Sequence, residues 1–200
     1  MAWLRKGELE ARKIDTKDYD EDGLKASIEE LRSYTLLGAQ EYGKKIIELF
    51  SKFGVAVVYI PSLEGTHIQG AAKWLSSNKA LIILSLRYKY SDIFWFTLFH
   101  ELGHLLLHSK KGLYVDFDNA TPVNTYENEA NSFAANSLIP SKEYLEFTSR
   151  GGFTSSSIQN FSNSMGINVG ILAGRLAFDK FLTWKNVSKL RVRLEFIKEK

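Results

Sequence analysis

The sequence lacks several features that would place it in common classes of protein. It contains no cysteine among its 200 residues, which excludes a disulfide framework, thiol catalysis and a cysteine-ligated metal site. No uninterrupted apolar run reaches the ~18 residues of a membrane span, and the first residues lack the apolar core of a signal peptide. The formal charge of +3 is small for this length, so charge alone indicates neither nucleic acid nor a membrane as partner. We therefore expect a soluble, cytoplasmic protein.

Hydrophobic residues make up 44% of the chain, which is enough to form a real core. Their pattern along the chain predicts both helices and strands, and therefore an α+β fold. Apolar residues recur at helical spacing in four segments: 24–37, 39–52, 93–109 and 125–139. Short apolar runs predict three strands, at 55–60, 71–75 and 80–86. Their tight connections indicate a small, mainly antiparallel sheet.

We expect three regions along the chain. Residues 1–23 are polar and charged and are interpreted as an N-terminal lead-in. Residues 24–145 hold the predicted strands and long helices, with an irregular stretch at 113–126. Residues 146–200 are predicted to form a helical C-terminal subdomain.

The stretch from Phe99 to His108 contains the motif H-E-x-x-H inside an apolar segment. On a helix His100 and His104 lie one turn apart, about 40° from each other, so both imidazoles can reach one ion. Glu101 lies about 60° from His104, close enough to hydrogen-bond a water held by that ion. Two imidazoles and a carboxylate that leave one position open are typical of catalytic zinc, Zn²⁺, and Glu101 is then the expected general base.

The motif is unlikely to arise by chance, since shuffling this composition gives it in roughly 0.6% of sequences. Unpartnered histidines and a carboxylate would also be costly within an ordinary buried helix, which is the competing interpretation. A zinc site of this type needs a third protein ligand, for which Glu127 and Glu129 on the following helix are candidates. Periodicity alone does not choose between these two glutamates.

Two further histidines are given other roles. His108 lies about 12 Å along the axis from His100 if the helix continues, which is too far for the same ion and favours an outer contact. His67 lies outside the motif region and is interpreted as a half-exposed strand residue.

The residues 99–108, FHELGHLLLH, followed by ENEANSFAANSLIP at 127–140, resemble the ImmA/IrrE family of metallopeptidase domains. The likeness covers about residues 40–145. It implies a small gluzincin-like fold and a zinc metallopeptidase, with His100 and His104 as ligands and Glu101 as base. It also implies that the third ligand is the glutamate before Ala-Asn, Glu129, in preference to Glu127. Asn131 is then expected to contact a ligand histidine.

The family mechanism also implies a donor to the oxyanion that forms during cleavage. Four tyrosines are candidates that the sequence does not rank: Tyr88, Tyr90, Tyr126 and Tyr144. An exposed strand beside the cleft would bind an extended peptide by strand addition, and residues 80–86 are the candidate because they directly precede the metal-binding helix.

The flanks at 3–8 and 170–176 look like segments of HigA-type antitoxin regulators, in which such a domain follows a DNA-binding domain. No such domain precedes it here, so we expect a stand-alone relative or a chain that begins after one. Peptidases of the family act on DNA-binding repressors, which makes a helix-turn-helix repressor or a toxin–antitoxin partner the expected substrate.

Two other functions stay open. The domain could be a non-proteolytic, metal-stabilised interaction module of a toxin–antitoxin or transcription regulator. Residues 158–193 could also form a basic helix-turn-helix that binds DNA, with Arg175 and Arg191 among its cations. A helical subdomain packed beside the core is the favoured interpretation of that segment, because short helix pairs are common.

Overall fold

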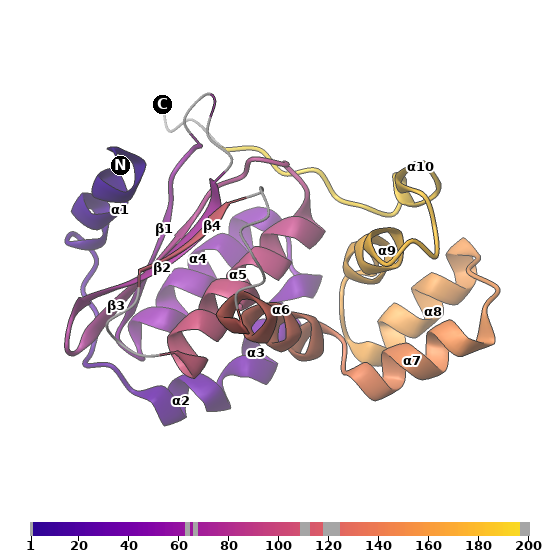
Figure 1. Cartoon of the computed structure of the whole chain (residues 1–200), viewed down its shortest axis with the longest axis horizontal. Coiled ribbons are helices and arrows are strands. Elements are labelled where there is room, and N and C mark those ends of the chain that lie inside the picture. Colours follow the sequence, from indigo (N-terminus) through magenta and orange to yellow (C-terminus); the bar gives the residue numbers. More distant parts are fainter. Residues whose placement is uncertain (1, 63–64, 66–67, 109–112, 118–124, 197–200) are drawn as a thin grey trace.

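The computed structural model describes residues 2–62, 65, 68–108, 113–117 and 125–196, which form an α+β fold as predicted (Figure 1). The strands are β1 (Val55–Tyr59), β2 (Ile68–Ser76), β3 (Lys79–Leu84) and β4 (Leu113–Phe117). The helices before the sheet and around it are α1 (Ala2–Ala11), α2 (Glu21–Ala26), α3 (Ile28–Ser33), the 3₁₀ helix η1 (Tyr34–Leu36), α4 (Ala39–Ser51), α5 (Ser91–Leu107) and α6 (Thr125–Leu138). The C-terminal helices are α7 (Ser141–Arg150), α8 (Ser155–Met165), α9 (Val169–Phe178) and α10 (Trp184–Val187).

The sheet is mixed and has the strand order β1-β3-β2-β4. β1 runs parallel to β3, whereas β2 runs antiparallel to both β3 and β4. The predicted number of three strands is therefore wrong, because β4 lies within the stretch at 113–126 that was expected to be irregular. The prediction of 80–86 as a substrate-binding edge is also wrong, because β3 is paired on both sides.

The strands β1 and β3 are continuously apolar because both of their faces are covered. Successive side chains point to opposite faces of a strand. Val57 and Ile82 belong to the core shared with α4 and α5, whereas Val58 and Ile83 belong to a second core on the other face. The two cores explain why strand residues at consecutive positions are all buried.

The helix α1 forms part of that second core, which corrects the expectation that residues 1–23 are only a lead-in. Trp3 and Ala11 are buried there, and the Trp3 indole Nε1–H donates to the Ile60 carbonyl over 3.2 Å. Glu8 on the same helix pairs with Lys73 of β2 at 2.5 Å. The sequence pattern did not predict this helix, because it is short and has only a narrow apolar stripe among charged residues.

We expect Trp3→Ala to lower the free energy of unfolding by about 3 kcal/mol or more, since the indole is only 2% exposed and its removal leaves a cavity. Urea denaturation measures this change. Leu9→Ala on the same helix is the control and should change stability by less than about 1 kcal/mol, because Leu9 is 45% exposed. Equal effects of the two variants would show that α1 does not pack as described.

The C-terminal helices lie beside the sheet domain (Figure 1) and are tied to both helices that follow β3. Arg191 forms a buried bidentate ion pair with Asp92 at the start of α5, with Nε at 3.0 and 2.9 Å from the two carboxylate oxygens. Arg175 of α9 donates to the Ala135 and Ile139 carbonyls at the end of α6. Where a domain boundary falls within 24–200 stays a prediction.

Each of these charges also suits the helix end that it occupies. The carboxylate of Asp92 lies at the positive N-terminal end of α5, and the guanidinium of Arg175 lies at the negative C-terminal end of α6. None of the helices in the described part of the chain combines the length and the apolarity needed to cross a membrane.

Candidate metal centre

The helix α5 carries the H-E-x-x-H motif through the middle of the molecule. It is apolar on nearly every side because it packs against the sheet, α6 and α9. His100 and His104 are therefore only 2% and 1% exposed, and Glu101 between them is fully buried. The helix begins at Ser91 and ends at Leu107, close to the predicted bounds.

The close approach of α6 to α5 depends on Gly103. A Cβ atom built at Gly103 would lie 3.2 Å from Ala130 Cα and 3.1 Å from the Phe133 ring. Glycine at 103 and alanine at 130 therefore let the two backbones come together, and the first turn of α6 lies over the histidines of α5. This contact positions the glutamates of α6 near the motif.

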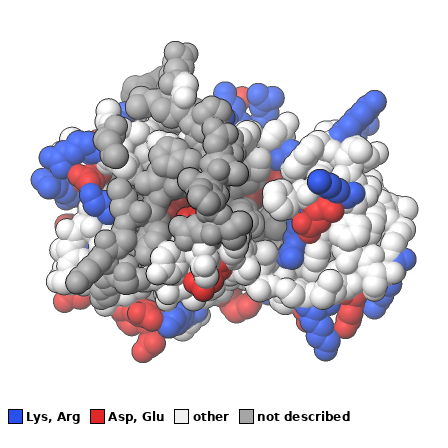
Figure 2. Space-filling model, in the orientation of Figure 1, with Lys and Arg blue, Asp and Glu red and all other residues white. Residues whose placement is uncertain are grey.

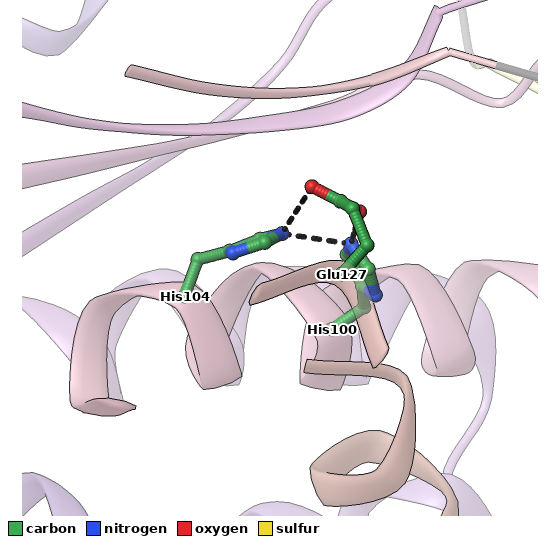
Figure 3. A group of neighbouring side chains, drawn as sticks. All are labelled: His100, His104 and Glu127. Carbon is green, nitrogen blue, oxygen red and sulfur yellow. Dashed lines mark hydrogen bonds and ion pairs between the residues drawn. The ribbon is translucent and has the colours of Figure 1, made fainter. Parts of the chain in front are cut away.

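His100, His104 and Glu127 form a cluster with donor atoms that all lie within 4.8 Å of one another. Figure 3 shows the two imidazoles projecting from α5 and the Glu127 carboxylate reaching them from α6. The Glu127 oxygens lie 3.3 Å from His100 Nε2 and 3.4 Å from His104 Nε2, and the two Nε2 atoms are 2.9 Å apart. Ligand atoms on a tetrahedral zinc lie about 3.3 Å from one another, so these three residues fit such an ion with a few tenths of an ångström of adjustment.

Asn131 fixes the tautomer of His100. The Asn131 Oδ1 lies 2.9 Å from His100 Nδ1, and a carbonyl oxygen can only accept, so Nδ1 carries the proton. In neutral His100 the Nε2 lone pair then faces His104 and Glu127. Asn131 thus contacts a histidine of the motif, as expected, and the role of that histidine as a ligand stays a prediction.

The charge states of the cluster also suit a cation. The neighbouring imidazoles of His100 and His104 hold the pKa of the Glu127 carboxyl well below its usual range. Burial is the main cause that lowers the pKa of His104, which favours the neutral form of this imidazole. An ionised carboxylate and a neutral imidazole are the states in which these groups bind metal ions.

The structure places Glu127, and not Glu129, beside the two imidazoles. Glu129 lies two residues further along α6, where its Oε2 is 3.1 Å from His108 Nε2. His108 Nδ1 in turn lies 3.0 Å from His104 Nδ1. The preference for Glu129 as third ligand does not agree with this geometry, which assigns Glu129 and His108 to contacts outside the cluster.

Glu101 lies where α5 faces β2. A Cβ atom at Gly70 of β2 would come within 2.5 Å of Glu101 Oε1 and 2.7 Å of Thr97 Cγ2, so β2 passes directly over this carboxylate. Only glycine allows such an approach without displacing one of these side chains. No signal in the sequence pointed to Gly70, because its role depends on a strand and a helix that are separated along the chain.

The four candidate tyrosines lie in different places. The ring centre of Tyr126 of α6 lies 4.7 Å from that of His108. The Tyr144 hydroxyl donates to Asp179 at 2.6 Å, and the Tyr90 ring lies 3.9 Å below the Arg191 guanidinium. Tyr88 stacks with Arg87 at 5.0 Å. An oxyanion role for one of them stays a prediction, and His67 lies outside the described residues.

An α+β domain with two helix-borne histidines, a buried glutamate between them and a carboxylate from the next helix defines a protein with an H-E-x-x-H-type site. The profile of the peptidase M78 family, described as an IrrE N-terminal-like domain, matches residues 50–175. The chain therefore belongs to this family, as the sequence motifs indicated. A comparison with curated proteins found no match.

Proposed function

We propose that this protein is a zinc-dependent endopeptidase. The observation that supports the proposal is the convergence of His100, His104 and Glu127 on one point, beside the buried Glu101 of the same helix as the histidines. Nitrogen, nitrogen and carboxylate oxygen are the donors that catalytic zinc sites use. The family is named for peptidases, which agrees with this chemistry.

The mechanism assigns separate roles to the residues of α5 and α6. A zinc ion held by His100, His104 and Glu127 would polarise the scissile carbonyl and bring the pKa of a water towards ~7. The Glu101 carboxylate would take a proton from the attacking water and pass it to the nitrogen of the leaving amine. Burial between α5 and β2 keeps Glu101 in one place, which favours both transfers.

We place the substrate among DNA-binding regulators, a helix-turn-helix repressor or a toxin–antitoxin partner, and this choice rests on the family resemblance alone. Direct DNA binding by the C-terminal helices is less well supported. A recognition helix must be exposed to enter a groove, whereas most of α9 is buried. Arg175 and Arg191 are engaged within the protein, and on the face shown in Figure 2 the cations over these helices are interspersed with other residues.

The proposal is tested by digesting a library of peptides from a bacterial proteome with the zinc-loaded full-length chain. Mass spectrometry is expected to detect new termini with the wild type, and none above background with Glu101→Gln at equal zinc content. Equal cleavage by the two proteins, or absence of cleavage by the wild type, would contradict peptidase activity through Glu101. If Glu101→Gln restores the phenotype of cells that lack this protein as well as the wild type does, the non-proteolytic interaction module is favoured.

Gly70→Ala is expected to lower kcat for a cleaved peptide by about 10- to 100-fold, because the new methyl group displaces the Glu101 carboxylate. The zinc dissociation constant should change by less than about threefold, since the atoms nearest to the new methyl group belong to Glu101 and Thr97 and not to the three proposed ligands. Gly43→Ala of α4 is the control, because its Cβ would meet nothing within 4 Å. Unchanged kcat in Gly70→Ala would show that the placement of Glu101 does not depend on this close approach.

A further inference from the structure

A chain of hydrogen-bonding groups leads away from His104 of the metal cluster. It consists of His104, His108 and Glu129, which we call the relay. His104 Nδ1 lies 3.0 Å from His108 Nδ1, and His108 Nε2 lies 3.1 Å from Glu129 Oε2. The side chain of His108 is only 1% exposed, whereas that of Glu129 is 50% exposed, so the relay connects the buried cluster to the surface.

The chemistry of the outermost group sets the protons of the whole relay. A carboxylate oxygen can only accept, so His108 Nε2 must carry the proton that is shared with Glu129. Neutral His108 then has a lone pair on Nδ1, which can only accept from His104. His104 Nδ1 must therefore be the donor, and the lone pair of neutral His104 lies on Nε2. That atom is the one that faces His100 and Glu127.

We propose that His108 and Glu129 are positioning residues, which hold His104 in the tautomer and orientation needed to bind zinc through Nε2. This inference rests on the proposed zinc site. The two ligand histidines would then be held by different means, His100 by the neutral amide of Asn131 and His104 by a carboxylate acting through a second imidazole. The Glu129 carboxylate also makes His104 a stronger donor to the metal, as acidic partners of ligand histidines do.

The relay also accounts for the third ligand residue that the sequence motif left ambiguous. Glu127 and Glu129 are two residues apart on α6, so they lie about 160° apart around the helix axis. One of them faces the cluster and the other faces His108. Both carboxylates of the stretch therefore act on the same site, one directly and one through two imidazoles.

The test measures zinc affinity of the full-length apoprotein by competition with a chromophoric chelator. Glu129→Gln and His108→Phe are each expected to raise the zinc dissociation constant by about 10- to 100-fold. His108→Gln should recover part of this loss, because the amide oxygen of glutamine can still accept from His104 Nδ1. Glu143→Gln, which changes a first-turn glutamate of α7, is the matched control and should bind as the wild type does.

A second readout reports the tautomer itself. Long-range ¹H–¹⁵N spectra of the histidine rings in the zinc-loaded protein are expected to show a protonated Nδ1 and a metal-bound Nε2 in His104. Binding within twofold of wild type by both Glu129→Gln and His108→Phe would overturn the relay, as would zinc bound through His104 Nδ1. A wild-type chain that does not bind zinc would instead overturn the proposed function, and the relay with it.

Discussion

Glu127→Gln is expected to weaken zinc binding by more than the roughly 100-fold that loss of an outer hydrogen-bond partner causes, because it removes a charged ligand from the cluster. Glu129→Gln should lose less, since its carboxylate contacts His108 and not the two ligand nitrogens. The measurement is chelator competition with both variants at the same pH. Peptidase activity should fall with zinc occupancy in Glu127→Gln.

Comparing the two variants decides whether Glu127, as the structure indicates, or Glu129, as the family resemblance implied, is the third ligand. If Glu129 were the ligand, as the family resemblance implied, the order of the two losses would be reversed. Thermal unfolding of the zinc-free variants serves as the control for folding. Similar melting temperatures are expected, because both side chains are partly exposed, at 29% for Glu127 and 50% for Glu129.

Asp92→Ala is expected to lower the free energy of unfolding by about 3 to 5 kcal/mol, because it leaves the Arg191 guanidinium buried without its partner. Both side chains are only 7% exposed, and burial raises the pKa of Asp92 despite the nearby arginine. The desolvation of both charges is therefore substantial. Urea denaturation of the apoprotein measures the loss.

Two further variants show that the loss comes from a broken pair. Arg193→Met, two residues further along the chain, removes an exposed arginine and should cost less than about 0.5 kcal/mol. Replacing the pair together, Asp92→Leu with Arg191→Met, should cost less than Asp92→Ala alone, since no charge is then left buried. A loss below about 1 kcal/mol in Asp92→Ala would contradict the assigned role of this pair in joining the C-terminal segment to α5.

The sequence predicted the parts of the site that depend on local periodicity. His100, His104 and Glu101 lie on one helix, so their relative positions follow from its geometry. The choice between Glu127 and Glu129 depended on which face of α6 meets α5. A packing face that includes Phe133 and Ser137 leaves the two glutamates at opposite edges. In the structure the buried residues are Ala130, Ala134 and Leu138.

The three buried residues Ala130, Ala134 and Leu138 are sufficient to distinguish the two glutamates. At 100° per residue, Glu127 lies within about 20° of the centre of the stripe formed by Ala130, Ala134 and Leu138, whereas Glu129 lies about 140° from it. The sequence alone did not reveal that Phe133 lies at the border of the contact, because a phenylalanine is normally weighted as core. Small residues that allow two helices to approach, such as Gly103 and Ala130, indicate the contact face more reliably here.

The fold was predicted least well where pairing partners are distant in sequence. The strand β4 has apolar or aromatic residues at 113–115 and 117, but it is short and is flanked in sequence by charged and turn-forming residues, which favoured an irregular stretch. Its pairing with β2 shows that it is a strand. The central position of β3 depends on its parallel pairing with β1, which local patterning does not reveal. The helix α1 is likewise buried through Trp3, which packs on a sheet face whose first strand begins about fifty residues further along the chain.

The crystal structure of the zinc-loaded full-length chain, with an anomalous difference map recorded at the zinc edge, tests the central claim most directly. We expect one peak about 2.0 to 2.2 Å from His100 Nε2, His104 Nε2 and a carboxylate oxygen of Glu127, with Glu129 still bound to His108. A peak coordinated by Glu129, or a map without a peak at this cluster, would contradict the account.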